Sequence, residues 1–331
     1  MTTPVELPAL DGRDPLGFLA ALGLLRVITA ACGPEVRLAF AADTGRALLL
    51  SPLPDISAIA AELTQVVSGI GDDCVLGDTG PGFPLRKGSR KTLRSAPTGG
   101  ESDPMRVSRE NFRGQLHAGV AELRSPAAAD WLTVLVTDLA TDRQGRAALT
   151  PYHAPAGQQS LWTFFEKPLA AVRAEPARLT EALTGWRRTD RVSGEYFDHR
   201  VLRSAADHPA GHSTEAGVPG ATWLATQALP LLRLTGDGRN PAAALWHRLG
   251  RRMIMIWPLW NHPLGEHAIR VLLEHPLLRP RPATDDPQPP PRAPRSALAP
   301  LGVFDVCGAE RQPIEGRKSA GVLAPIPVMD T

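Results

Sequence analysis

The chain has 331 residues, enough for about two domains or one large one. Hydrophobic residues make up 43% and charged residues 21%, so the chain has enough apolar material for a core, and global disorder is excluded. With 36 Lys and Arg against 34 Asp and Glu, the net charge is +2. Overall charge therefore predicts no nucleic-acid partner, and any such site has to be a local patch.

The cysteine content and the N-terminal sequence also indicate in which cellular compartment the protein resides. The three scattered cysteines form no C-x-x-C pair, which argues against a disulfide framework and against a cysteine zinc site. The first 14 residues include Glu6 and Asp11 and no basic stretch, so they do not have the pattern of a signal peptide. The apolar run 16–32 is short for a membrane span and contains Arg26. We therefore expect a cytoplasmic protein without a membrane partner.

The first strong element is a helix over residues 15–31. Asp14 is a good N-cap, and Pro15 suits the first helical position. Apolar side chains cover nearly the whole circumference of this helix, so we expect it to be buried on most sides. A hairpin over residues 36–50 follows, with its turn at residues 43–45.

The next region alternates between helices and long connections. A second helix is predicted over residues 55–67, with Asp55 as N-cap, and a glycine- and charge-rich connection follows over 69–103. Such a loop inside a compact domain is either functional or disordered. Residues 187–220 are also polar and irregular. Helical spacing predicts further helices over 107–123, 126–139, 160–172, 176–183 and 221–232.

The C-terminal part combines a strand over residues 252–257 with a helix over 263–275. Residues 279–295 are rich in proline, which predicts a stiff, exposed linker. Two later apolar stretches, 302–307 and 322–328, could pair as a hairpin that returns to the body.

Together these elements predict an α+β fold, a mostly helical body with short antiparallel β elements and long Gly/Pro-rich loops. We expect an N-terminal α+β domain over residues 1–150 and a helical C-terminal domain over 151–278. Residues 279–331 would form a proline-rich linker and a C-terminal tail.

No phosphate-loop, dinucleotide-binding, nucleophile-elbow or zinc-protease motif occurs in the chain. A cluster of aspartates and histidines is the best metal candidate, because carboxylates and neutral imidazoles bind divalent ions. Pro209 and Gly211 interrupt the helical spacing of its histidines, so a solvated polar loop is the simpler interpretation. We predict no cofactor and no stoichiometric zinc or manganese. The cluster consists of Asp198, His199, Asp207, His208 and His212.

The best binding candidate is the basic segment, residues 84–114. It holds eight basic and three acidic residues, a local net charge of +5 in a chain whose total is +2. Its glycines allow close approach of the backbone to phosphates, and basic side chains hold a polyanion without reading its sequence. A solvated loop with no partner is the alternative. The candidate phosphate contacts are Arg86, Lys87, Arg90, Lys91, Arg94, Arg106 and Arg109.

A second candidate is the arginine–aromatic segment, residues 186–203. Arginines beside aromatic rings can grip phosphates while the rings stack on bases. The alternative is ordinary packing of Trp186 and Phe197, since large aromatic side chains are mostly buried. The candidate contacts here are Arg187, Arg188, Arg191 and Arg200.

Several blocks of the sequence resemble one group of proteins. Residues 10–26, LDGRDPLGFLAALGLLR, resemble the first helix of CRISPR-associated proteins encoded in type I-U/I-G loci. These families include large-subunit-like components and an extension of the CRISPR helicase-nuclease. Residues 196–200 followed by 217–225, and 257–260 followed by 263–265, are similar to later segments of the same families.

The resemblance implies a non-catalytic subunit or accessory of a CRISPR effector complex in antiviral defence. The chain is much shorter than the longest large-subunit family, and it has no match to a catalytic motif of the helicase-nuclease. The implied partners are other effector subunits or the helicase-nuclease, together with guide RNA or target DNA. Two alternatives stay open. One is a metal-dependent hydrolase or nuclease that uses the aspartate–histidine cluster, and the other is a pure protein–protein scaffold.

Overall fold

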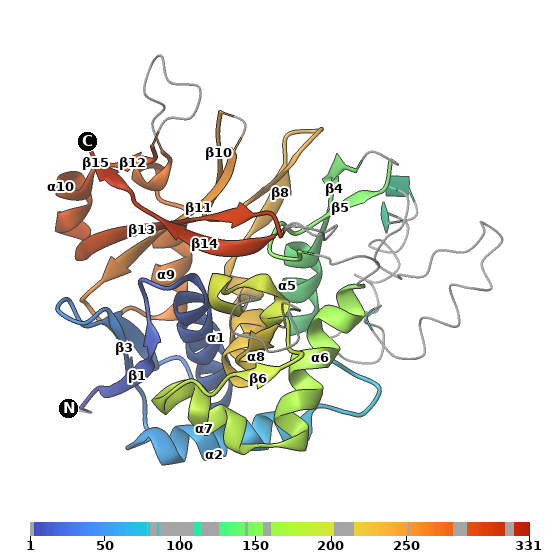
Figure 1. Ribbon diagram of the computed structural model, residues 1–331, viewed down its shortest axis with the longest axis vertical. Helices are drawn as coiled ribbons and strands as arrows, with labels where there is room; N and C mark the ends of the chain where they lie inside the picture. Colours follow the sequence, from blue (N-terminus) through green and yellow to red (C-terminus); the bar gives the residue numbers. More distant parts are fainter. Residues whose placement is uncertain are drawn as a thin grey trace, which may run out of the picture.

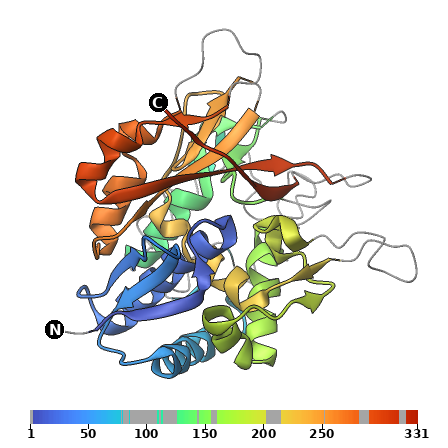
Figure 2. The same cartoon turned by 60° about the vertical axis from the view of Figure 1, so that its left-hand side comes forward.

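The computed structural model shows a layer of helices beside a layer of strands, with α1 and α8 between the two (Figures 1 and 2). The N-terminal elements lie on the helical side, and the C-terminal strands form the layer at the top of Figure 1. The described residues are 3–77, 79, 85, 109–110, 112–113, 126–142, 145–154, 160–201, 215–250, 252–280, 290–314 and 321–331.

Helix α1 (Pro15–Cys32) is the centre of the fold. It begins as predicted, with the Asp14 carboxylate accepting hydrogen bonds from the Leu16 and Gly17 N–H groups at 2.9 and 3.2 Å. By length and composition α1 could cross a membrane, but 72% of it is buried inside the protein. It packs closely on α8 (Pro219–Gln227), and a Cβ at Gly23 would lie only 1.7 Å from the Leu224 carbonyl oxygen. Glycine is therefore required at this crossing.

The remaining helices surround this pair. Asp55 caps its helix as expected, and Ser160 caps another helix whose cap was not predicted; their side chains accept from the Ala58 and Thr163 N–H groups. These helices are α2 (Ile56–Gly69), α5 (Pro126–Leu135), α6 (Leu161–Ala174), α7 (Ala177–Thr184), α9 (Glu266–Leu273) and α10 (Arg295–Leu298). Single 3₁₀ turns are η1 (Gly194–Tyr196), η2 (His199–Val201), η4 (Leu229–Leu231), η5 (Pro276–Leu278) and η6 (Ala299–Leu301).

Two sheets contain most of the strand residues. The N-terminal sheet is antiparallel in the order β1 (Val5–Asp11), β3 (Arg46–Leu50), β2 (Arg37–Phe40), which confirms the predicted hairpin. The C-terminal sheet is antiparallel in the order β10 (Trp246–Leu249), β11 (Arg252–Trp260), β13 (Val303–Gln312), β14 (Val322–Ile326). The predicted pairing of the two C-terminal apolar stretches is only partly right. Residues 322–326 pair with residues 308–312 of β13, whereas residues 303 and 305–307 of that strand pair with β11.

Four strand pairs complete the β structure of the described residues. Three are antiparallel, and the β12–β15 pair is parallel. They are β4 (Val136–Thr141) with β5 (Ala147–Leu149), β6 (Thr189–Asp190) with β7 (Ala216–Gly217), β8 (Leu234–Gly236) with β9 (Pro241–Ala243), and β12 (Arg292–Ala293) with β15 (Met329–Asp330).

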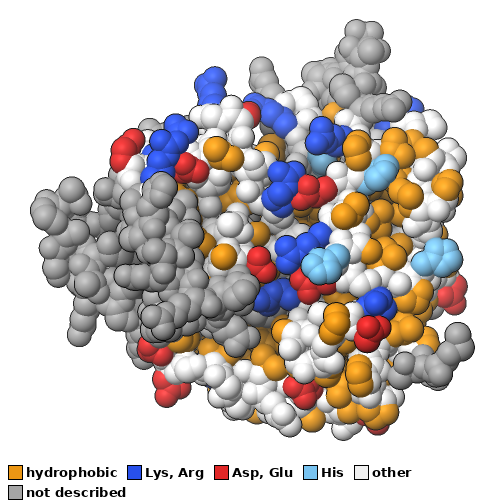
Figure 3. All heavy atoms as spheres, turned by 180° about the vertical axis from the view of Figure 1, so that it is seen from behind, with side chains coloured by type: hydrophobic (Ala, Val, Ile, Leu, Met, Phe, Trp, Pro, Cys, Tyr) orange, Lys and Arg blue, Asp and Glu red, His pale blue; other side chains and the backbone are white. Residues whose placement is uncertain are grey.

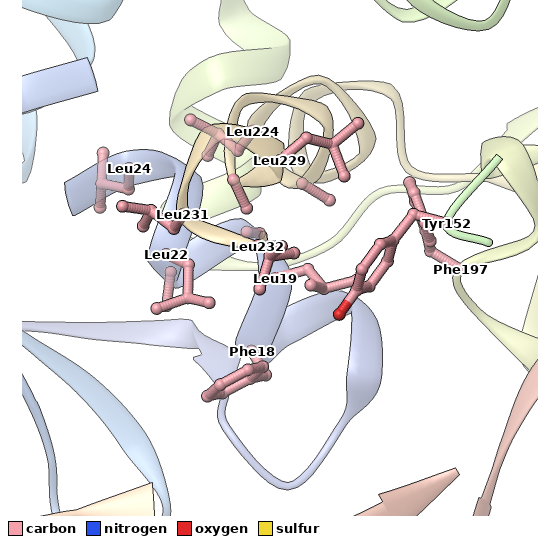
Figure 4. Close-up of a cluster of buried hydrophobic side chains, with 14 of the residues drawn as sticks. Phe18, Leu19, Leu22, Leu24, Tyr152, Phe197, Leu224, Leu229, Leu231 and Leu232 are labelled. Atoms are coloured by element: carbon pink, nitrogen blue, oxygen red, sulfur yellow. The ribbon is translucent and has the colours of Figure 1, made fainter. Parts of the chain in front are cut away.

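One continuous apolar core joins the two layers. Side chains from α1, α8 and η4 interlock in it (Figure 4). At the boundary with the sheet, the indole N–H of Trp257 donates to the Gly12 carbonyl at 2.7 Å, and that of Trp260 donates to the Leu38 carbonyl at 2.8 Å. Both tryptophans also pack against the ring of Phe18. The C-terminal sheet is thus tied directly to the N-terminal elements.

The prediction of a mostly helical body is wrong. Of the described residues 41% are helical and 29% lie in strands, so the fold is mixed. The predicted helix 126–139 ends at Leu135, because the β-branched residues Val136 and Thr137 continue as β4. The predicted helix 263–275 begins only at Glu266, because Leu264 bridges to Leu38 of β2. The domain boundaries at residues 150 and 278 stay predictions.

Candidate functional site

The structure describes residues at the two ends of the basic segment. Six of its predicted contacts lie outside the described residues: Arg86, Lys87, Arg90, Lys91, Arg94 and Arg106. Arg109 is half-buried. Leu85 and Phe112 are buried in the main core, with 2% and 3% of their surfaces exposed. Both described ends of the basic segment are therefore held in the core, and Arg113 at the second end pairs with Asp138 at 2.6 Å.

The arginine–aromatic segment supplies an ion-pair network that we call the arginine–aspartate junction: Asp14, Arg188, Asp198 and Arg200. Asp198 is 2% exposed, and its two oxygens accept from Arg188 Nη2 at 2.5 Å and from Arg200 Nε at 3.0 Å. Arg200 Nη2 also donates to Asp14, the N-cap of α1. The junction thereby attaches the segment to the start of the central helix.

The two aspartates of the junction respond differently to burial. Burial raises the pKa of Asp14 to about 6, although the charge of Arg200 acts in the opposite direction. Burial also acts to raise the pKa of Asp198, but the hydrogen bond from Arg188 and the charge of Arg200 outweigh it and hold that pKa below its usual value. Asp198 is therefore ionised at neutral pH, and its charge is balanced by two guanidinium groups.

The other members of this segment are mostly engaged within the protein. Arg187 pairs with Glu175 at 2.5 Å and with Glu181 at 2.7 Å. The Arg200 guanidinium lies 5.4 Å from the centre of the Trp186 ring. Phe197 is fully buried and packs edge-on against Phe164. Of the predicted contacts here, Arg187, Arg188 and Arg200 are thus paired with carboxylates.

Arg191 lies apart from this network, at a pocket of about 390 Å³ beside α6. Its backbone has a φ of 64°, and Glu195 and Tyr196 have φ values of 50° and 59°. These left-handed conformations are uncommon for residues other than glycine, and such strain gathers at functional sites. The same pocket is lined by Lys167, Ser193, Glu195, Glu215 and Thr222.

Sequence reasoning missed several of these residues. Asp14 was expected only as a helix cap, yet it also binds Arg200, which lies 186 positions away. No local sequence pattern predicts an ion pair between residues as far apart as Asp14 and Arg200. Glu215 lines the pocket and accepts from the Tyr196 hydroxyl at 2.9 Å, a contact between segments that the sequence separates by a polar loop.

The aspartate–histidine cluster is only partly placed. Asp198 belongs to the junction, and His199 lies beside it with Nδ1 at 3.8 Å from a carboxylate oxygen. Burial lowers the pKa of His199. Asp207, His208 and His212 lie outside the described residues. Among the residues that are described, no group of three or more His, Cys, Asp or Glu side chains is arranged to hold a metal ion.

Comparison with known proteins identifies no relative from which a function could be inferred. The relation to CRISPR-associated proteins rests on the sequence blocks described above and stays a prediction. No protein-family model matches the sequence, and no curated protein matches it.

Proposed function

We propose that this protein is a non-catalytic, nucleic-acid-binding subunit or accessory of a type I-U/I-G CRISPR effector complex. The basic segment would bind the phosphate backbone of guide RNA or target DNA. One observation carries the proposal: a net charge of +5 is concentrated in about thirty residues whose ends, at Leu85 and Phe112, are held in the core.

The charges elsewhere support the choice of this segment. Because the whole chain has a net charge of +2, the residues outside the basic segment together carry −3. A polyanion is therefore not attracted by the protein as a whole. The arginines at 187, 188 and 200 are already balanced by carboxylates, so releasing them for phosphate would cost their ion pairs. The basic segment is the remaining local concentration of cations that sequence reasoning identifies.

The proposal is tested by replacing Arg86, Lys87, Arg90, Lys91 and Arg94 with alanine. Five phosphate contacts on a single strand predict a slope of about −3.5 for the logarithm of the binding constant against the logarithm of salt concentration, at roughly −0.7 per contact. The variant should flatten this slope and weaken binding similarly for all sequences, because phosphate contacts carry no base information. Binding to single- and double-stranded DNA and RNA at several salt concentrations measures both effects.

A matched control removes the same number of charges from elsewhere on the surface. Arg46, Lys167, Arg239, Arg248 and Arg292 are exposed, and their replacement by alanine changes the net charge equally. This control variant should bind with nearly the affinity of the wild type. Equal losses in the two variants would show that total charge, and not the basic segment, governs binding. A wild type that binds no nucleic acid, alone or within the assembled complex, would overturn the proposal and favour the scaffold.

A further inference from the structure

Among the described residues, two exposed cations without an acidic partner line the pocket of about 390 Å³ beside α6. On the face opposite to that of Figure 1, basic and acidic side chains lie beside one another (Figure 3). By contrast, Lys167 of α6 and Arg191 form no ion pair and no side-chain hydrogen bond with another residue that the structure describes. Two such cations at one cavity indicate a site for an anionic group of a ligand.

Two carboxylates line the same cavity and are more buried than the cations. Glu195 is 3% exposed, and Glu215 is half-buried. Glu215 Oε1 accepts from the Tyr196 hydroxyl at 2.9 Å. An ionised carboxylate has about four acceptor positions, so this one bond does not saturate it. The cavity therefore combines buried negative charge with exposed positive charge.

The backbone around the cavity holds one cation and one carboxylate next to each other. The Arg191 N–H donates to the Glu215 carbonyl at 2.7 Å, beside the β6–β7 pair. Arg191 and Glu195 both have left-handed backbone conformations, and the Phe197 N–H closes the turn by donating to the Gly194 carbonyl at 3.1 Å. These hydrogen bonds are present without a ligand. The fold itself therefore places the charges of the cavity.

The rest of the cavity is suited to an apolar group. More of its surface is apolar than polar. Because alanine side chains end at Cβ, α6 leaves space there that a ligand can fill. Cavities of about 300–1,000 Å³ with apolar walls and a few placed polar groups are typical of small-molecule sites. The uncharged side chains that line it are Pro168, Ala170, Ala171, Val192, Ser193 and Thr222.

We propose that this cavity binds an α-amino acid with an apolar side chain. The carboxylate of the ligand would pair with Lys167 and Arg191, and its ammonium group would donate to Glu215. The side chain of the ligand would lie against Ala170 and Ala171. An α-amino acid carries its two charges on groups joined through one carbon, which suits a cation and a carboxylate held at directly bonded backbone positions. This site is distinct from the basic segment and does not depend on the proposed function.

Calorimetric titration with L-valine, L-leucine, L-methionine and L-phenylalanine tests the proposal. At least one of them should bind saturably with a stoichiometry of one. Its amide lacks the carboxylate and its N-acetyl derivative lacks the ammonium group, so each should bind at least about tenfold more weakly. No saturable binding of any of the four, or derivatives that bind as tightly as the parent amino acid, would overturn the proposal.

Two variants test the assigned contacts. Lys167→Ala removes one cation without altering the strained loop, and it should weaken binding of the amino acid by about tenfold. Glu215→Gln should weaken it similarly but leave the weak binding of the N-acetyl derivative unchanged, because that derivative has no ammonium group. Arg239→Ala, an equal change of charge at another exposed position, is the control and should keep the wild-type affinity. Thermal unfolding confirms that each variant is folded, and folded Lys167→Ala and Glu215→Gln proteins with wild-type affinity would contradict the site.

A dipeptide distinguishes a free amino acid from the N-terminus of a partner chain. A dipeptide that begins with the same residue keeps the ammonium group but moves the carboxylate away, so it should bind at least about tenfold more weakly. Equal affinity would overturn the amino-acid assignment in favour of a chain terminus. The variant with five alanines in the basic segment should keep its affinity for the amino acid even where it loses nucleic-acid binding. Loss of both together would contradict a separate site.

Discussion

The basic segment and the arginine–aromatic segment are both rich in arginine, but their local net charges differ: +5 in the basic segment against +2 in the arginine–aromatic segment, which holds five basic and three acidic residues. In the arginine–aromatic segment, Arg188 and Arg200 pair with Asp198 and Asp14, and Arg187 pairs with glutamates of a neighbouring helix and its flank. The basic segment contains eight cations and only three acidic residues of its own. A run of arginines therefore indicates a phosphate site only when the fold brings too few carboxylates to neutralise it.

Removing the buried carboxylate of Asp198 is the most direct test of whether Arg188 and Arg200 are held by ion pairs within the protein. Asp198→Asn leaves Arg188 and Arg200 facing a neutral amide, so we expect a loss of about 3–5 kcal/mol in the free energy of unfolding. Chemical denaturation measures the loss. Asp190→Asn, an exposed aspartate of the same segment, is the control and should change stability by less than about 0.5 kcal/mol. A stable Asp198→Asn protein with stronger nucleic-acid binding would show that these arginines are available to phosphates.

A smaller effect should appear in the pH dependence of the protein's stability, through the titration of Asp14. Its pKa is raised from 3.8 to about 6 in the folded protein, so the folded state holds this proton over a pH range where the unfolded chain has lost it. Stability contributed by the protonated group is complete below about pH 4 and falls as the pH rises to about 6. The full contribution of this proton to the free energy of unfolding is about 3 kcal/mol.

Asp14→Asn isolates this contribution, because asparagine also caps helices but does not ionise. The difference in unfolding free energy between variant and wild type should shift in favour of the variant as the pH rises from 4 to 7. Denaturation of both proteins at several pH values gives this difference directly. A difference that is constant with pH would mean that Asp14 titrates alike in the folded and unfolded states.

The smallest expected effect is at Arg187, an exposed cation of the arginine–aromatic segment. Its side chain is 57% exposed and its partner Glu175 is 44% exposed, so solvent and salt screen the pair. Arg187→Ala should therefore lower stability only slightly, and the loss should shrink further in high salt. Thermal unfolding at two salt concentrations measures it. A loss as large as that of Asp198→Asn would place Arg187 within the structural network.

The parts of the fold that were predicted correctly depend on local signals. The helix starts after Asp14, Asp55 and Ser160 are each marked by a capping side chain within a few residues. The errors arose where the partner is remote. The sequence predicts β4 as the end of a helix, because its strand partner lies beyond a turn and its own residues fit both structures. Short strands such as β8 and β9 contain too few residues for an alternation of apolar and polar side chains to appear.

The site residues follow the same division. The sequence places Arg188, Asp198 and Arg200 in one segment, but it does not show that they bind one another and Asp14. The cavity between β8, β9 and the end of α9 was not predicted from the sequence. Arg233, His247 and Arg279 are each unremarkable in sequence, and only the packing of β8 and β9 against the end of α9 brings them to one cavity.

The position of β13 constrains how this protein can be made. β11 ends at Trp260, and the strand that covers its open edge begins only at Val303. During synthesis at about 5–20 residues per second, β11 leaves the ribosome seconds before its partner exists. Over that interval a row of unpaired N–H and C=O groups, flanked by Met255 and Trp257, is available to other nascent chains. We expect the newborn protein to need a chaperone, or a partner already in place, until its last strands have emerged.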